Sequence, residues 1–239
     1  MINANVQSEA SVLAANIEMT SYSEKVLHES NITVTSGKLY KDKPVYDTVK
    51  RAFDIACSFM ALTVLAPMML IVMVLIVIDD FGNPIYTQER VGKNGKLFKI
   101  YKFRSMYKKA DKKLEELKAM DECKGATFKM KNDPRITKIG SIIRKTSIDE
   151  LPQLINILKG DMSIIGPRPF IPREQANLPE DRLLVTPGLS CYWQIGGKNS
   201  LTTEEQIELD RKYIKDRSVF VDLKIIIKTA LFVFKSSNS

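Results

Sequence analysis

The stretch Ile55–Ile78, IACSFMALTVLAPMMLIVMVLIVI, runs for 24 residues without a charge and decides the fold of this chain. As an α-helix it would be about 36 Å long, enough to cross a hydrocarbon layer of about 30 Å. Pro67 lies near its midpoint, where a proline lacks the backbone N–H and its ring clashes with the carbonyl of Thr63. Length alone favours one membrane-spanning helix, whereas the proline predicts a sharp kink or a break.

Basic residues lie on both sides of this segment and help to choose between the two topologies. Lys50 and Arg51 precede it, and a basic stretch that begins at Arg90 follows it. A straight span would export one of these groups, against the tendency of basic residues to stay in the cytoplasm. We therefore predict a re-entrant helix-break-helix at 46–80, broken at Pro67, with both flanks on the cytoplasmic face.

Outside the membrane segment, composition predicts one domain and two tails. Polar residues dominate 1–45, which we expect to be a mobile tail with at most one short helix. Residues 81–235 are numerous enough to bury a core and are assigned to a cytoplasmic domain, and 236–239 form a C-terminal tail.

Local patterns predict a mostly α-helical fold with a small β-hairpin, an α+β class. The segments PIYTQER and LFKIYKF are strand candidates, and Asn94-Gly95 between them suits a tight hairpin turn. The predicted helices cover 108–120, the end of a helix at 142–144, 151–158 before Gly160, 201–216 and 219–234. The last of these is very apolar, so it either lies in the membrane interface or is a core helix.

Composition excludes several classes of chemistry. The 239 residues include 36 Lys and Arg against 28 Asp and Glu, a net charge of +8, but one histidine and three cysteines. Ser-His-Asp catalysis, histidine metal sites and structural zinc are therefore excluded, and no Gly-x-Gly or Walker A pattern occurs. The chemistry must use carboxylates, basic side chains, backbone groups and a hard metal ion.

The stretch Arg90–Lys113 carries ten basic residues and one acid. Anionic lipid headgroups, a nucleic acid and a phosphorylated substrate all fit such a charge. The neighbouring membrane segment disfavours nucleic acid, so charge alone favours lipid headgroups.

Two adjacent acids, Asp149 and Glu150, give the most informative motif. Ser147-x-x-Glu150 matches a helix capping box, a purely structural use of these residues. Pro152 instead favours a helix that begins near Asp149, which places both carboxylates at a helix N-terminus. Such a pair suits phosphoryl transfer, with one carboxylate attacking phosphorus and the other holding Mg²⁺. Two arginines, Arg144 and the proline-framed Arg168, are candidates to neutralise the phosphate oxygens.

Several motifs together resemble the bacterial sugar transferase family, the monotopic phosphoglycosyl transferases. They are KRAFDIACS, QERVGKNGKLFKIYKFRSM, KNDPRITKIGSIIRKTSIDELPQLINILKGDMSIIGPRPF, PGLSCYWQIGGKN and ELDRKYI, spread over residues 50–234. The resemblance implies transfer of a sugar-1-phosphate from a UDP-sugar to polyprenyl (undecaprenyl) phosphate, with release of UMP. It implies the first membrane step of a surface polysaccharide or glycan, such as exopolysaccharide or capsule. It also implies membrane lipids as partners, no nucleic acid, and the cytoplasmic face of the bacterial inner membrane.

The resemblance also assigns roles to residues. Asp149 would be the nucleophile that forms a covalent phosphosugar intermediate, and Glu150 would be associated with Mg²⁺. Further substrate or phosphate contacts would come from Arg144, Arg168, Lys102, Arg104, Lys198 and Asp210. A bundle of N-terminal membrane helices found in larger members is absent, so the chain resembles a short form.

Three positions depart from the family pattern: Ala66 stands where many members have serine, Cys191 replaces a glycine, and Lys198 replaces an arginine. Lysine lacks the guanidinium fork, so donor contacts at Lys198 would differ. The sugar that is transferred stays open. Two other functions also stay open: a non-catalytic, basic, membrane-anchored interaction protein, and a nucleotide-sugar phosphohydrolase that uses the same carboxylates with water.

Overall fold

The computed structural model describes residues 41–108, 110, 133–195 and 201–237. The tail predicted at 1–45, the helix predicted at 108–120 and Lys198 lie wholly or mostly outside the described residues.

The described part is mostly helical with small sheets, which confirms the predicted class. The helices of seven or more residues are α2 (Pro44–Asp79), α4 (Lys138–Lys145), α5 (Gln153–Lys159), α8 (Thr203–Asp216) and α9 (Val219–Ser237). Shorter elements are β1 (Ile85–Val91), η2 (Lys93–Gly95), β2 (Leu97–Phe103), η5 (Ile148–Glu150), β3 (Ser163–Ile165), α6 (Pro172–Gln175), η6 (Glu180–Leu184), β4 (Gly188–Ser190) and α7 (Tyr192–Ile195).

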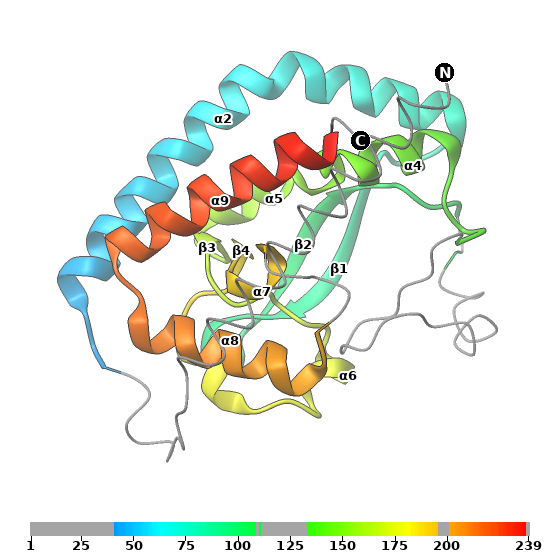
Figure 1. Cartoon of the computed structure of the whole chain (residues 1–239). Helices are drawn as coiled ribbons and strands as arrows, with labels where there is room; N and C mark the ends of the chain where they lie inside the picture. The colour runs from blue at the N-terminus through cyan, green and yellow to red at the C-terminus, as the bar shows by residue number, and fades with distance from the viewer. Residues whose placement is uncertain (1–40, 109, 111–132, 196–200, 238–239) are drawn as a thin grey trace, which may run out of the picture.

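Helix α2 is continuous through Pro67, so the predicted break in the helix is wrong. A proline removes one hydrogen bond of the ladder, and the apolar helix formers on either side keep the remaining turns in place. Figure 1 shows that α2 arches over the rest of the molecule. Among the described residues, α2 is the one helix long and apolar enough to cross a membrane, by length and composition.

Both ends of α2 are fastened to the same domain. At its start, Lys50 Nζ lies 2.7 Å from Asp222 Oδ2 of α9. At its end, the Asp79 carboxylate accepts a hydrogen bond of 2.9 Å from the amide of Ile139 in α4. Along the inner side, residues such as Ile76 are buried against the hairpin and α4. The helix therefore lies along the domain and does not project from it (Figure 1).

The outer side of α2 and one side of α9 are apolar and exposed. Figure 1 shows α9 running alongside α2, and the two helices are in contact. Ile225 of α9 is fully buried in the core, so this helix packs one side inward and leaves the other uncovered. The exposed side chains include Phe59, Met60, Val64, Leu70, Ile71 and Val74 of α2 and Phe220, Leu223, Ile227 and Leu231 of α9.

The predicted hairpin is confirmed. β1 and β2 pair antiparallel, with Val91 opposite Leu97. The turn has positive φ at both central residues, 56° at Asn94 and 77° at Gly95. This is the conformation that follows the right-handed twist of the strands and favours Asn-Gly.

The hairpin and helix α5 share a small core that positions the site. Phe98 and Ile100 of β2 pack against Leu154 and Ile157 of α5. The predicted stop of this helix is confirmed, because Gly160 takes the left-handed conformation at φ 87°. A second core lies under α7, α8 and α9, and α8 begins with the capping box of Thr202 and Glu205.

Candidate active site

The carboxylate pair lies on a tight turn between α4 and α5. After α4, Ser147 adopts the left-handed conformation at φ 58°, unusual for a residue other than glycine, and redirects the chain into η5. Asp149 and Glu150 are both in η5, and α5 begins only at Gln153 with Pro152 as its N-cap. Ser147 forms no capping bond, so the capping-box alternative is wrong. The predicted helix start near Asp149 is confirmed for the short 3₁₀ helix η5, which has both acids in its first turn, and is wrong for α5, which begins three residues after Glu150.

Two cations converge on Glu150. Lys102 Nζ lies 2.8 Å from Glu150 Oε1, and Arg168 Nη1 lies 3.7 Å from the same oxygen. Lys102 reaches η5 because it follows Phe98 and Ile100 on the side of β2 that packs against α5. About one fifth of each of these side chains is exposed, so the cluster is partly shielded and still open to a ligand.

A third cation, Arg90, extends this cluster and was not singled out from the sequence. Its guanidinium lies 3.9 Å from Glu174 and donates to the carbonyl of Pro169 at 3.2 Å. Burial, followed by the nearby Arg168, lowers the pKa of Arg90 to about 10, so it stays charged near neutrality. Within the described part of the chain, its Nε is buried without a hydrogen-bond partner. A buried donor beside a second arginine is an arrangement that favours an anion.

The remaining predicted site residues are placed less directly. Arg144 is in the last turn of α4 and is exposed. Arg104 directly follows β2, and its side chain donates to the carbonyl of Asp80, the residue after α2, and lies 3.7 Å from the Asp80 carboxylate. Asp210 is 1% exposed and pairs with Arg182 at 2.6 Å, so the structure places its carboxylate inside the protein and against an arginine. Burial raises the pKa of Asp210, and Arg182 opposes that rise.

The segment that carries Arg168 is fixed by a close contact between backbones. Gly166 and Gly188 meet where β3 and β4 pair in parallel. A Cβ on Gly188 would lie 2.0 Å from the amide nitrogen of Gly166, so only glycine fits there. The glycines of the GPRP motif (166–169) and the PGLS motif (187–190) thus serve this packing.

The pair fits a magnesium ion that is completed by a substrate. Mg²⁺ in phosphoryl-transfer sites is held by one or two carboxylates together with phosphate oxygens and water. Asp149 and Glu150 supply such carboxylates in one short turn. Among the described residues, no three His, Cys, Asp or Glu side chains gather to hold a metal ion by themselves. Glu150 would hold the ion beside Lys102, which already neutralises one of its oxygens.

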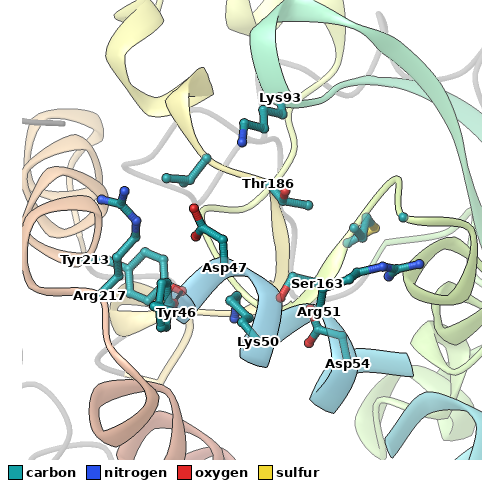
Figure 2. Close-up of a pocket in the computed structure, with 13 residues that line it drawn as sticks. Tyr46, Asp47, Lys50, Arg51, Asp54, Lys93, Ser163, Thr186, Tyr213 and Arg217 are labelled. Carbon is teal, nitrogen blue, oxygen red and sulfur yellow. Dashed lines mark hydrogen bonds between the residues drawn. The ribbon is translucent and has the colours of Figure 1, made fainter. Parts of the chain in front are cut away.

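A separate cavity of about 100 Å³ lies at the other end of α5. Figure 2 shows Asp47 of α2 and Lys93 of the hairpin turn pointing into its open middle. None of the predicted site residues lines it. Its arginines are used to hold helices: Arg51 donates to the carbonyls of Ile157 and Leu158 at the end of α5. We therefore place the candidate active site at the carboxylate pair.

The comparison with protein families agrees with these motifs. Residues 45–236 match the family model described as bacterial sugar transferase. The chain belongs to the bacterial sugar transferase family. The match begins at the second residue of α2 and includes the carboxylate pair, the cations around it and α9.

Curated relatives of this sugar transferase extend the comparison. It is 43% identical over 198 residues to "Undecaprenyl-phosphate galactose phosphotransferase" of Salmonella typhimurium, covering 80% of this chain but 41% of that protein. It is 39% identical over 206 residues to "Exopolysaccharide production protein ExoY" of Rhizobium meliloti, covering 82% of this chain and 90% of that protein. It is 37% identical to "Galactosyl transferase CpsE" of Streptococcus agalactiae, covering 98% of this chain and 54% of that protein.

Sequence reasoning missed Arg182, the buried partner of Asp210 in this sugar transferase. Arg182 is in the short η6 turn, where no hydrophobic period marks it. A weak signal exists, because Asp-Arg dipeptides occur at 181–182, 210–211 and 216–217. The first two dipeptides pair crosswise in space, Arg182 with Asp210 and Arg211 with Asp181.

Proposed function

We propose that this chain transfers a sugar-1-phosphate from a UDP-sugar to polyprenyl (undecaprenyl) phosphate and releases UMP. The observation that carries this proposal is the convergence of Lys102 and Arg168 on Glu150, the neighbour of Asp149 in η5. Cations at this turn can bind a phosphate that the two carboxylates would otherwise repel, and so allow Asp149 to attack it. The names of the relatives, which include undecaprenyl-phosphate phosphotransferases of galactose, glucose and N-acetylgalactosamine, support the acceptor and leave the sugar open.

The proposed reaction has two displacements at one phosphorus atom. A carboxylate oxygen of Asp149 attacks the β-phosphorus of the UDP-sugar, and the bond from that phosphorus to the bridging oxygen breaks. UMP leaves with the bridging oxygen, and the sugar phosphate stays on Asp149 as an acyl phosphate. An oxygen of polyprenyl phosphate then attacks the same phosphorus. The acyl phosphate bond breaks, the free carboxylate of Asp149 is restored, and a polyprenyl diphosphate sugar is formed.

The cations have separable roles in this proposal. Arg168 and Arg90 bind the non-bridging oxygens of the transferred phosphate, whose charge is shared in the transition state. Lys102 orients Glu150 through their 2.8 Å contact. When bound, Mg²⁺ held by Glu150 would neutralise charge on the diphosphate of the donor.

The proposed location is the cytoplasmic face of the inner membrane, with the continuous helix α2 entering and leaving the membrane on that same face. It is supported by the attachment of both ends of α2 to one domain, through Asp222 at the start and Ile139 at the end. A bilayer between the two ends would have to divide that domain. The exposed apolar sides of α2 and α9 would instead enter one leaflet, and the basic hairpin would face anionic headgroups.

The decisive experiment follows the covalent adduct. The purified protein is incubated with Mg²⁺ and UDP-galactose, UDP-glucose or UDP-N-acetylgalactosamine, with and without undecaprenyl phosphate, and UMP release is measured. We expect release that depends on the lipid during turnover, and a phosphosugar adduct on Asp149 in intact and peptide mass spectra when the lipid is omitted. We expect Asp149→Asn to lose both the adduct and transfer while it still binds vesicles.

Three outcomes would contradict the proposal. An adduct on another residue of an active preparation would remove Asp149 as nucleophile. Full transfer by Asp149→Asn would do the same. Steady UMP formation without any lipid acceptor would favour a phosphohydrolase. Asp161→Asn is a matched control, because its carboxylate is exposed to a similar extent as that of Glu150 but lies beyond the far end of α5, where it pairs with Lys159 at 3.5 Å.

A further inference from the structure

The segment that carries Arg168 cannot hold itself in place. Prolines on both sides of Arg168 remove two amide donors, so the segment forms no helix or strand of its own. Instead, every carbonyl from 167 to 170 accepts a hydrogen bond from another part of the chain. The donors, in that order, are the amide of Gly188 at 2.9 Å, the side chains of Arg182 at 3.0 Å and Arg90 at 3.2 Å, and the amide of Val91 at 2.9 Å.

Arg182 makes the densest set of contacts among these donors. Its Nη2 donates to the carbonyl of Arg168, and its Nη1 donates to Gln175 Oε1 at 2.9 Å. Its Nε and Nη2 both bind Asp210 Oδ2, at 3.2 and 2.6 Å. Its guanidinium carbon lies 4.4 Å from the centre of the Phe170 ring. One side chain thus connects α8, α6, Arg168 and Phe170.

The burial of this ion pair indicates a specific use. Arg182 is 3% exposed and Asp210 is 1% exposed, so neither is available to a ligand. Removing two charges from water costs several kcal/mol per ion, and an apolar pair of similar volume is often as stable. The arrangement does give Arg182 a fixed orientation, with its fork divided between a carboxylate and a backbone carbonyl.

We propose that Arg182, oriented by Asp210, is a positioning residue that sets the Arg168 side chain against Glu150. The proposal rests on the proposed function, because it assigns to Arg168 the contact with the transferred phosphate. It also changes the role expected for Asp210, which acts through Arg182 and Arg168 without touching the substrate. Lysine at 182 cannot replace arginine, because a single ammonium cannot reach the carboxylate, the amide oxygen and the carbonyl in this planar arrangement.

The test compares two ion pairs that join the same two elements. Arg182→Lys and Asp210→Asn alter the pair beneath the GPRP segment. Arg211→Lys and Asp181→Asn alter the neighbouring pair, which also joins η6 to α8 at 2.7 Å and, among the described residues, forms no hydrogen bond with that segment. Single-turnover UMP release from UDP-galactose is measured for all four, with protein in excess so that slow variants are still quantified. We expect a loss on the order of 10- to 100-fold for the first two variants and less than about twofold for the control pair.

A double-mutant cycle separates positioning from general support of the fold. Arg168→Ala removes the side chain that is being positioned and keeps the backbone carbonyl that Arg182 binds. In that background, we expect Arg182→Lys to change the single-turnover rate by less than about twofold. Thermal unfolding followed by the fluorescence of buried Trp193 shows whether each variant is folded. If Arg182→Lys does not fold, Asp210→Asn takes its place in the cycle.

Two results would overturn the positioning role. Wild-type rates in folded Arg182→Lys would do so, and so would an equal loss with and without the Arg168 side chain. A failure of the proposed function has a different signature, since Asp149→Asn would then keep its activity whatever the cycle shows.

Discussion

Replacing Asp222 with asparagine tests the attachment of α2 to the catalytic domain. Three donors converge on this carboxylate: Lys50 Nζ at 2.7 Å, the hydroxyl of Tyr46 at 2.9 Å and the hydroxyl of Tyr213 at 3.0 Å. Burial, followed by the charge of Asp222, raises the pKa of Tyr46, so its hydroxyl keeps the proton that it donates. Asparagine retains one acceptor oxygen, loses the charge and turns an amide N–H₂ toward a donor.

The size of the effect follows from burial and charge. A hydrogen bond to a charged group contributes about 1.5–3 kcal/mol, and breaking a buried pair costs about 3–5 kcal/mol because one charge is left without a partner. The side chains of Lys50 and Asp222 are 14% and 10% exposed, so solvent compensates part of this loss. We expect Asp222→Asn to lower the free energy of unfolding by about 2–4 kcal/mol. For a chain of this size that corresponds to a fall in Tm of about 5–15 °C.

The assay uses the single tryptophan of the chain, Trp193, which is 3% exposed. Its emission is recorded during heating of the protein in nanodiscs. Asp216→Asn is the control. Asp216 of α8 also pairs with a lysine, Lys212 of the same helix, at 3.0 Å, but its side chain is 35% exposed. We expect a change below about 0.5 kcal/mol for the control. Equal Tm values for the two variants would refute the reasoning, since burial would then make no difference.

Three other predictions follow from the packing, the charges and the topology. Gly188→Ala should destabilise the fold by about 2–4 kcal/mol, because the new Cβ meets backbone that cannot move aside, and the same fluorescence assay measures it. The hydrogen bond from Arg135, opposed by burial, lowers the pKa of Asp133, so its contribution to stability is complete above the unfolded pKa of about 3.9 and disappears as pH falls through the lower folded value. The stability difference between wild type and Asp133→Asn should therefore be constant from pH 7 to pH 5 and shrink below pH 4, and a difference that grows on acidification would contradict it. With the native cysteines replaced, single cysteines at Lys41 and Lys93 should both react with a membrane-impermeant maleimide only after spheroplasts are opened, whereas labelling of either one in intact spheroplasts would indicate a spanning helix.

The elements with local signals were predicted well from the sequence. Asn94-Gly95 carries its own turn preference, and Gly160 carries its own helix stop, so neither depends on distant residues. Whether α2 is continuous or broken is not decided by a local signal of this kind. Whether Pro67 breaks a helix depends on what packs around it, and here the domain supports the helix at both ends. Composition identified the apolar segment and could not determine its continuity.

The candidate site was also predicted only in part: its residues were recognisable from the sequence, and their arrangement depends on the tertiary fold. Asp149 and Glu150 were recognisable as a pair because they are adjacent, but their place in η5 depends on the left-handed Ser147, which no residue preference predicts. Lys102 and Arg168 were predicted singly, and their meeting at Glu150 depends on the packing of β2 on α5 and on the bonds that hold the segment of Arg168. Arg182 has only a weak local signal, because three Asp-Arg dipeptides offer several pairings and only the tertiary fold selects one.

The fastening of α2 at both ends has a consequence for the choice of lipid environment. A membrane-spanning anchor tilts or stretches when bilayer thickness changes, and the height of an attached enzyme changes with it. A helix that is clamped along a rigid body and immersed in one leaflet has no opposite end to match. The vertical distance from the acyl chains to Asp149 is then a property of the protein, and we expect transfer rates to be similar in thin and thick bilayers of equal surface charge.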